Sequence, residues 1–121
     1  AGAIGGLFGI PHGLICGTLM AAVNKVNVME LRKINTDHPA LKKYATLGKI
    51  FSEEKGKNDD FYTDSFIDIL RKMTDDLNLP GLGSYGLKSG DVTLIVTEAD
   101  SKNNPVRLSK ELMAKIIGER L

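Results

Sequence analysis

Apolar side chains recur at steps of three and four residues along most of the chain, a spacing that is typical of amphipathic α-helices. The first of these runs predicts a helix from Gly13 to about Arg32. Its inward stripe is Ile15, Leu19, Ala22, Val26 and Met29. Pro11 cannot occupy a helix interior, because its ring removes a hydrogen-bond donor and collides with the preceding turn. We therefore expect a break, or the first turn of this helix, just before His12.

Two further helices are predicted downstream of this one. The first begins at Asp37-His38-Pro39, because proline is favoured in the first turn of a helix. Its apolar positions are Leu41, Tyr44, Ala45 and Phe51. A polar loop over residues 52–60 then precedes the clearest apolar stripe of the chain, which ends at Leu79-Pro80-Gly81. That stripe consists of Tyr62, Phe66, Ile69, Leu70, Met73 and Leu77.

The last two helices are predicted from their caps and their spacing. Residues 92–99 are rich in β-branched side chains, which would also suit a strand, but their apolar positions keep helical spacing. Asp91 is the expected N-cap of this helix, and Ser109 is the expected N-cap of the last one. The inward positions of the two helices are Val92, Ile95, Val96, Ala99, Leu112, Met113, Ile116 and Ile117. No segment alternates like a strand, so the predicted fold class is all-α, a bundle-like domain of about five to six helices.

The composition fits one ordinary globular domain. The chain has 121 residues, of which 42% are hydrophobic and 26% are charged, enough for one modest core. A formal net charge of +1 gives no reason to expect nucleic acid or acidic lipid as a partner. The single cysteine, Cys16, cannot form an intramolecular disulfide, which fits a reducing compartment. We expect one domain over residues 1–121 and a cytoplasmic location.

The first charged side chain is Lys25, so the chain begins with an uncharged segment. Residues 1–23 are long enough to span a hydrocarbon layer of about 30 Å. Six glycines, together with Pro11, His12 and Thr18, lower the hydropathy of this segment, and no basic region precedes it as in a signal peptide. We expect a helix surrounded by protein and no membrane anchor. The sequence does not begin with Met, which suggests processing or a segment of a longer protein.

The stretch Gly81-Leu82-Gly83-Ser84-Tyr85-Gly86 matches the dinucleotide-binding pattern G-x-G-x-x-G letter for letter. Asp100 follows at about the distance of twenty residues at which a ribose-binding acid is expected. The pattern, however, requires a strand before it and a helix that opens from it. Here it follows a helix and a proline, so we interpret it as a turn between two helices.

His12 and Cys16 are four residues apart, so they share one face of the predicted helix, and both residue types bind metals. A stable zinc or iron site has three or four protein ligands, and the chain has no second cysteine. The other histidine, His38, is expected to be exposed at a helix start. We therefore expect no complete metal site within this chain, and Cys16 to pack as a small buried hydrophobic residue. No nucleophile–base pair is recognisable either.

Residues 5–13, Gly-Gly-Leu-Phe-Gly-Ile-Pro-His-Gly, and the apolar helix through Val-Met-Glu-Leu resemble the iron-containing alcohol dehydrogenase family. Later elements agree in order, and the resemblance covers essentially the whole chain. These elements are the polar loop, a helix leading into Asn78-Leu79-Pro80-Gly81-Leu82, the Gly90-Asp91 helix start, and Asn104-Pro105-Val106-Arg107. The resemblance implies most of a C-terminal helical domain of the dehydroquinate synthase-like type. It also implies a separate N-terminal α/β domain that binds a nicotinamide cofactor.

In this family a divalent metal, usually iron and sometimes zinc, is held by one Asp and three His at the interdomain cleft. The motif match makes His12 the last of these ligands, and the other three would precede Ala1. A lone His12 does not make a stable metal site, so the resemblance implies that the chain alone is inactive. The family often carries a further histidine ten residues before the Pro-His-Gly histidine, where this chain has Gly2. Its polar or proton-relay role is then lost or taken by another group.

The implied reaction is metal-assisted hydride transfer between NAD or NADP and a small alcohol or aldehyde, with the metal polarising the alcohol oxygen. Two alternative functions remain open. One is a stand-alone helical interaction or scaffolding domain that uses an exposed apolar patch. The other keeps the superfamily, as a zinc-dependent polyol dehydrogenase or a dehydroquinate synthase-like domain. We also expect the exposed cleft-facing side of the Gly13–Arg32 helix to self-associate, which concentration-dependent sedimentation would show.

Overall fold

The computed structural model describes all residues 1–121 and contains helices only, which confirms the all-α prediction. Six α-helices are present, at the upper end of the predicted number. Their bounds are α1 Gly2–Phe8, α2 His12–Ile34, α3 Pro39–Phe51, α4 Asp59–Asp76, α5 Val92–Glu98 and α6 Lys110–Gly118. Two short 3-10 turns, η1 Leu82–Tyr85 and η2 Ser89–Asp91, connect α4 to α5.

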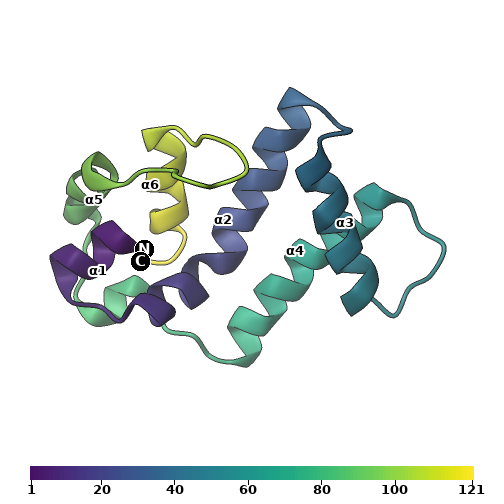
Figure 1. Ribbon diagram of the computed structural model, residues 1–121. Coiled ribbons are helices and arrows are strands. Elements are labelled where there is room, and N and C mark those ends of the chain that lie inside the picture. Colours follow the sequence, from purple (N-terminus) through teal and green to yellow (C-terminus); the bar gives the residue numbers. More distant parts are fainter.

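The long helix α2 runs through the middle of the molecule and separates two groups of helices (Figure 1). The hairpin of α3 and α4 packs on one side of α2. The shorter helices α1, α5 and α6 pack on the other side, where α1 contacts α5 and α6 contacts both α2 and α5. The buried apolar side chains of both groups form one continuous cluster of 21 residues. Helix α2 therefore contributes to the whole core.

The helix starts are set by local signals, which the sequence predicts for α2, α3 and α6. Helix α2 begins directly after Pro11. His38 caps α3, because its Nδ1 accepts a hydrogen bond from the Ala40 backbone N–H at 3.1 Å. Asn58 caps α4, because its Oδ1 accepts a hydrogen bond from the Phe61 backbone N–H at 2.8 Å. Ser109 caps α6, because its Oγ accepts one from the Leu112 backbone N–H at 3.2 Å. Each cap satisfies a backbone donor that has no partner within its own helix.

The prediction that the side chain of Asp91 caps the helix after it is wrong. Asp91 does precede α5, but its Oδ2 accepts a hydrogen bond from the backbone N–H of Lys88 at 2.8 Å. The carboxylate therefore stabilises the short 3-10 turn Ser89–Asp91 and is not available to α5. The sequence pattern identifies Asp91 as a capping residue. It does not identify the backbone N–H group from which the Asp91 carboxylate accepts its hydrogen bond.

Helix α1 was not predicted from the periodicity. It contains three glycines among seven residues, a composition that disfavours a helix in isolation. Packing overrides this preference, because Ile4 is only 2% exposed and joins the common core. The helix ends at Gly9, which has a φ of 65°, a left-handed conformation that glycine adopts without strain.

The buried face of α4 differs from the predicted stripe. Tyr62, Phe66 and Leu70 are buried as expected, but Met73 and Leu77 are 49% and 65% exposed. Their place is taken by Thr63, Ile67 and Thr74. The reason is that α4 packs against two helices, α3 and α2, so its buried face is broader than one stripe and turns toward α2. Met29 and Phe51, also predicted to face inward, are likewise exposed.

Helices α3 and α4 cross with their backbones in close approach at Gly48. A Cβ atom at Gly48 would lie only 2.5 Å from the carbonyl carbon of Tyr62, and closer still to its oxygen. No side chain larger than a hydrogen atom fits between the two helices at this point. On the same helix pair, the Tyr62 hydroxyl donates a hydrogen bond to the Glu54 carbonyl oxygen at 3.1 Å, which ties the connecting loop to α4.

A reciprocal amide pair joins α2 to the loop before α6. Asn27 Nδ2 donates to Asn104 Oδ1 at 2.9 Å, and Asn104 Nδ2 donates to Asn27 Oδ1 at 2.7 Å. Asn27 is only 2% exposed, so water cannot replace its partner. Asn104 also donates to the carbonyl oxygen of Val106 at 2.7 Å, which fixes the shape of the loop itself.

Replacing Asn104 with alanine should lower the free energy of unfolding by about 2 kcal/mol, because the buried amide of Asn27 loses its partner. The double variant Asn27→Ala/Asn104→Ala should cost less than the sum of the two single variants, since no unpaired amide is left behind. Urea denaturation of the four proteins measures this coupling. Strictly additive losses would show that the pair contributes no mutual stabilisation.

Candidate functional site

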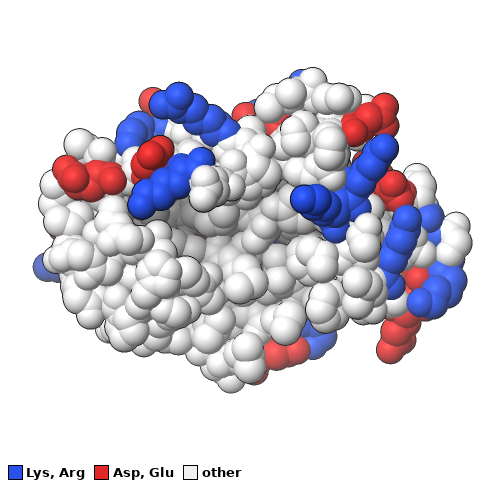
Figure 2. All heavy atoms as spheres, viewed as in Figure 1, with Lys and Arg blue, Asp and Glu red and all other residues white.

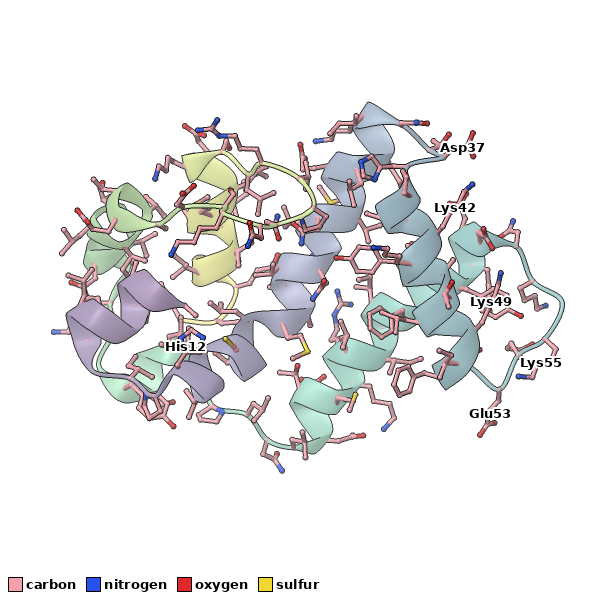
Figure 3. The ribbon with its side chains drawn as sticks, viewed as in Figure 1. His12, Asp37, Lys42, Lys49, Glu53 and Lys55 are labelled. Carbon is pink, nitrogen blue, oxygen red and sulfur yellow. The ribbon has the colours of Figure 1, made fainter.

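His12 is the first residue of α2 and lies where α1 leads into that helix (Figure 3). Pro11, with a φ of −55°, precedes it, and the backbone carbonyl of Pro11 accepts the first hydrogen bonds of the helix, from Leu14 and Ile15. The His12 side chain is exposed and makes no hydrogen bond or ion pair within the chain. Both ring nitrogens are therefore free to bind a group from outside this chain.

An uncharged surface surrounds this histidine. No Lys, Arg, Asp or Glu occurs before Lys25, and the exposed side chains of α1 and the first turns of α2 include Leu7 and Met20. Figure 2 shows a broad area without charged side chains over α1 and the first half of α2, with charged side chains toward the edges of the view. We call this area the uncharged face. It lowers the cost of bringing another protein surface close to His12.

Helix α2 is long and apolar enough to cross a membrane by length and composition alone. Within the fold, however, it is the central core helix, a position for which the same apolar composition is required. Its buried residues are Ile15, Thr18, Leu19, Ala22, Val26, Asn27, Val28 and Leu31. The core of the domain therefore accounts for the apolar character of about half of α2, and the remainder lies on the surface.

The prediction that Cys16 is buried is wrong. Cys16 is a free, exposed cysteine on α2, one turn after His12. The buried stripe of this helix runs through Ile15 and Leu19. Cys16 follows Ile15 by one residue and is turned away from that stripe by about 100°. The thiol therefore shares the exposed surface with His12 and takes no part in the core.

No group of three or more His, Cys, Asp or Glu side chains comes together in the chain to hold a metal ion. The second histidine, His38, is engaged through its Nδ1 in capping α3. The free imidazole of His12 has the donor chemistry that iron and zinc accept. The residues thus fit one part of a metal site whose remaining donors would have to come from outside these 121 residues.

Gly2, the position at which the resembled family often has a histidine, is exposed at the start of α1. A Cβ atom at Gly2 would meet nothing within 4 Å. Packing therefore does not require glycine there.

The glycine-rich stretch Gly81 to Gly86 forms the η1 turn between α4 and α5, as predicted. Its glycines have a structural reason, because a Cβ atom at Gly81 or Gly83 would lie 3.0 Å from the backbone of Arg120 or Leu121. The Arg120 side chain locks this contact through Nε to Thr18 Oγ1 at 2.9 Å and Nη2 to the Leu79 carbonyl oxygen at 2.6 Å. The turn is thus a docking point for the last residues of the chain, and no strand precedes it as nucleotide binding would require.

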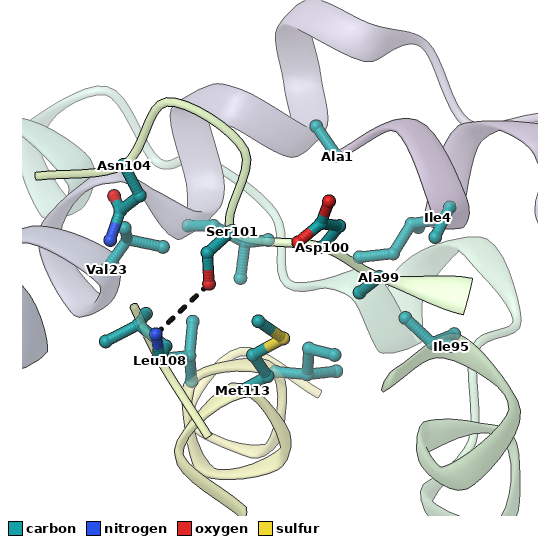
Figure 4. A pocket seen from close by; sticks show the side chains of 14 residues that line it. Ala1, Ile4, Val23, Ile95, Ala99, Asp100, Ser101, Asn104, Leu108 and Met113 are labelled. Atoms are coloured by element: carbon teal, nitrogen blue, oxygen red, sulfur yellow. Dashed lines mark hydrogen bonds between the residues drawn. The ribbon is translucent and has the colours of Figure 1, made fainter. Parts of the chain in front are cut away.

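A cavity of about 270 Å³ lies between α1, α2 and the segment from α5 to α6 (Figure 4). Eleven of its fourteen lining residues are hydrophobic, including Ile4, Ile95 and Met113. Among the polar ones, the Ser101 hydroxyl oxygen accepts a hydrogen bond from the Leu108 N–H at 3.1 Å. His12 is not among the lining residues. The cavity is open to solvent on one side and adjoins α1, but it does not reach His12.

Two side chains have clearly shifted pKa values, and neither lies in α1 or the first turns of α2. Burial raises the pKa of Tyr44, whose hydroxyl donates a hydrogen bond to Asn24 Oδ1 at 2.6 Å. Hydrogen bonds from its own backbone N–H and from Ser109 lower the pKa of Glu111. Both shifts have structural causes, at the contact of α3 with α2 and at the start of α6.

Comparison with known proteins agrees with the fold. The family described as Fe-containing alcohol dehydrogenase family, C-terminal, matches residues 1–121. Among solved structures, the chain resembles 1,3-propanediol oxidoreductase, with a TM-score of 0.79 and 21% sequence identity over 99% of this chain. The chain spans 31% of the length of that protein. No curated protein gave a significant sequence match.

Proposed function

Because the chain belongs to the iron-containing alcohol dehydrogenase family, as its C-terminal domain, we propose that it supplies one metal ligand, His12, and one wall of an active-site cleft. The reaction would be hydride transfer between NAD or NADP and a small alcohol or aldehyde. The observation that carries this proposal is the free, exposed His12 at the start of α2, on a face without charge. The other wall, with the nucleotide site and the remaining ligands, would belong to an N-terminal domain.

The residues of this chain hold and orient the site. When bound, iron or zinc would act as a Lewis acid toward the alcohol oxygen. His12 would donate a ring nitrogen to it from a fixed position, because Pro11 sets the direction of the chain and α2 is anchored in the core. The uncharged face would exclude water from the cleft and bring no competing charge near the hydride path. These are binding and positioning roles, which suits a domain without a nucleophile–base pair.

The domain by itself should not turn over substrate, since no three metal donors come together in it and the nucleotide site would belong to the N-terminal domain. We expect no oxidation of NADH or NADPH by the 121-residue chain with Fe²⁺ and a panel of aldehydes. A protein that joins this domain to its nucleotide-binding domain should be active under the same conditions. Absence of turnover by that protein over the whole panel, with either cofactor and with Fe²⁺ or Zn²⁺, would contradict the proposed function.

We further propose that the protein works in the cytoplasm, as one unit over residues 1–121 within the larger enzyme. The uncharged face would be covered there by the N-terminal domain. In the isolated chain the same face, with Leu7 and Met20 43% and 46% exposed, would pair with a second copy of itself.

A further inference from the structure

Thr18 lies on the second turn of α2, after His12, and is only 1% exposed. A threonine in a helix can donate its hydroxyl hydrogen to the carbonyl oxygen four residues earlier, as Thr46 and Thr74 do in this chain. The Thr18 hydroxyl instead donates to the carbonyl oxygen of Pro80 at 2.9 Å. This hydrogen bond joins the first half of α2 to the segment that follows α4.

The Arg120 guanidinium completes a set of three hydrogen bonds at this point. Its Nε donates to Thr18 Oγ1 at 2.9 Å, and its Nη2 donates at 2.6 Å to the carbonyl oxygen of Leu79, the residue before Pro80. The end of the chain therefore lies beside the first half of α2 (Figure 1). A planar guanidinium holds its acceptors in fixed directions, which a flexible ammonium group does not. We call these three hydrogen bonds the Thr18–Arg120 bridge.

The first turns of α2 have little other directional support. The helix has no side-chain N-cap, because Pro11 occupies that position. Gly13 and Gly17 lie in the first two turns, and glycine is among the least favourable residues in a helix interior. Ile15 is fully buried and holds this end in the core, but apolar burial has no preferred direction. The bridge therefore supplies directed contacts at Thr18 where the helix itself is weakest.

We propose that Thr18 and Arg120 are positioning residues for His12, because their bridge fixes the first two turns of α2 relative to the rest of the domain. Thr18 follows His12 by six residues, which is about 9 Å along the helix axis. In a variant without the bridge, these turns should open locally and move the imidazole while the core stays folded. This inference rests on the proposed metal-binding role of His12, to which it adds two residues that do not touch the metal.

Amide hydrogen exchange of the 121-residue chain tests the bridge itself. In Thr18→Val and Arg120→Ala, the amides of residues 15–19 should exchange at least about tenfold faster, because these turns lose hydrogen bonds that hold them closed. The amides of residues 28–34, at the other end of the same helix, should exchange as in the unchanged chain. Thr18→Ser keeps the hydroxyl and should keep the original rates.

Lys25→Gln is the matched control for the exchange measurement. Lys25 on α2 forms an ion pair with Glu119, the residue before Arg120, at 3.4 Å, and both side chains are exposed. The control thus removes a contact between α2 and the same end of the chain. It should leave the exchange rates of α2 unchanged, since exposed ion pairs contribute little to stability.

Metal affinity of the complete enzyme tests the effect on His12. Thr18→Val and Arg120→Ala should weaken Zn²⁺ binding, measured against a competing chelator, by about 10- to 100-fold, as is usual when a group that supports a metal ligand is lost. Thr18→Ser should retain the affinity. Asn104→Ala is the control for general destabilisation, because it weakens the fold at Asn27, toward the other end of α2, and should leave zinc affinity unchanged.

Three results would overturn the positioning role. These are unchanged exchange in both bridge variants, an equal increase of exchange along the whole of α2, or unchanged zinc affinity in both variants. If zinc affinity is unchanged in both bridge variants but lost in His12→Ala, the positioning role is wrong and the proposed function stands. If His12→Ala leaves the metal content of the complete enzyme unchanged, the proposed function fails, and the positioning role of Thr18 and Arg120 fails with it.

Discussion

Replacing His12 with alanine in the complete enzyme should lower kcat/KM for alcohol oxidation by about 10³-fold or more, since a Lewis-acid metal contributes several kcal/mol to catalysis and 1.36 kcal/mol is a factor of ten. The bound metal should fall together with the rate, because one protein ligand is removed. Elemental analysis of the purified protein and steady-state kinetics with added Fe²⁺ or Zn²⁺ measure both effects. The fold should be unaffected, because the His12 side chain is exposed and makes no hydrogen bond or ion pair within the chain.

His38→Ala is the control for this experiment. It removes the only other histidine and with it the Nδ1 cap of α3, so it should cost about 1 kcal/mol of stability. It should leave the metal content and the rate at saturating substrate unchanged. Retention of full metal content and activity by His12→Ala would contradict the assignment of His12 as a ligand.

Replacing Gly48 with alanine should lower the free energy of unfolding by about 3 kcal/mol, the upper end of the usual cost of overpacking a core. The added methyl group would overlap the backbone of Tyr62, and backbone atoms cannot move aside as the end of a flexible side chain can. Helices α3 and α4 would have to separate along their contact. Thermal unfolding should therefore begin more than about 10 °C lower than in the unchanged chain.

Gly118→Ala makes a matched comparison. Gly118 is also a helical glycine, at the end of α6, but a Cβ atom there would meet nothing within 4 Å. This substitution should be neutral or stabilise the protein by about 0.5 kcal/mol, because alanine has less freedom to lose on folding. Equal effects of the two substitutions on the free energy of unfolding would mean that the contact between α3 and α4 has room for a methyl group at position 48.

The starts of the helices could be predicted because they depend on residues next to one another in the sequence. Three of these signals act within one turn of the chain: Pro11 before α2, His38-Pro39 at α3 and Ser109 at α6. Which face of a helix is buried depends instead on distant elements. Met73 and Leu77 continue the apolar spacing of α4 but project into solvent, because the last turns of α4 face α2 through Thr74.

The candidate site shows the same division between local and distant causes. The Pro-His-Gly motif was sufficient to single out His12, because its position at a helix start follows from the neighbouring proline. The exposure of Cys16 could not be predicted in the same way, since a small apolar side chain beside a buried stripe fits either environment. The clearest sequence signal for its exposure is its offset of one residue from Ile15, which is fully buried. The remaining donors of the proposed metal site would lie outside the chain, so no pattern within it could reveal them.

The central position of α2 has a consequence for how the domain loses its structure. This helix is about 35 Å long, and it forms part of the packing of both helix groups. Neither group can melt while the other stays intact without exposing one side of α2, so the two should open as one cooperative unit. Apart from fraying of its first turn, the support beneath His12 therefore persists until the whole domain unfolds. The position of His12, the proposed ligand, is then protected by the global stability of the domain. A destabilising change as distant as Gly48 would reach it only through complete unfolding.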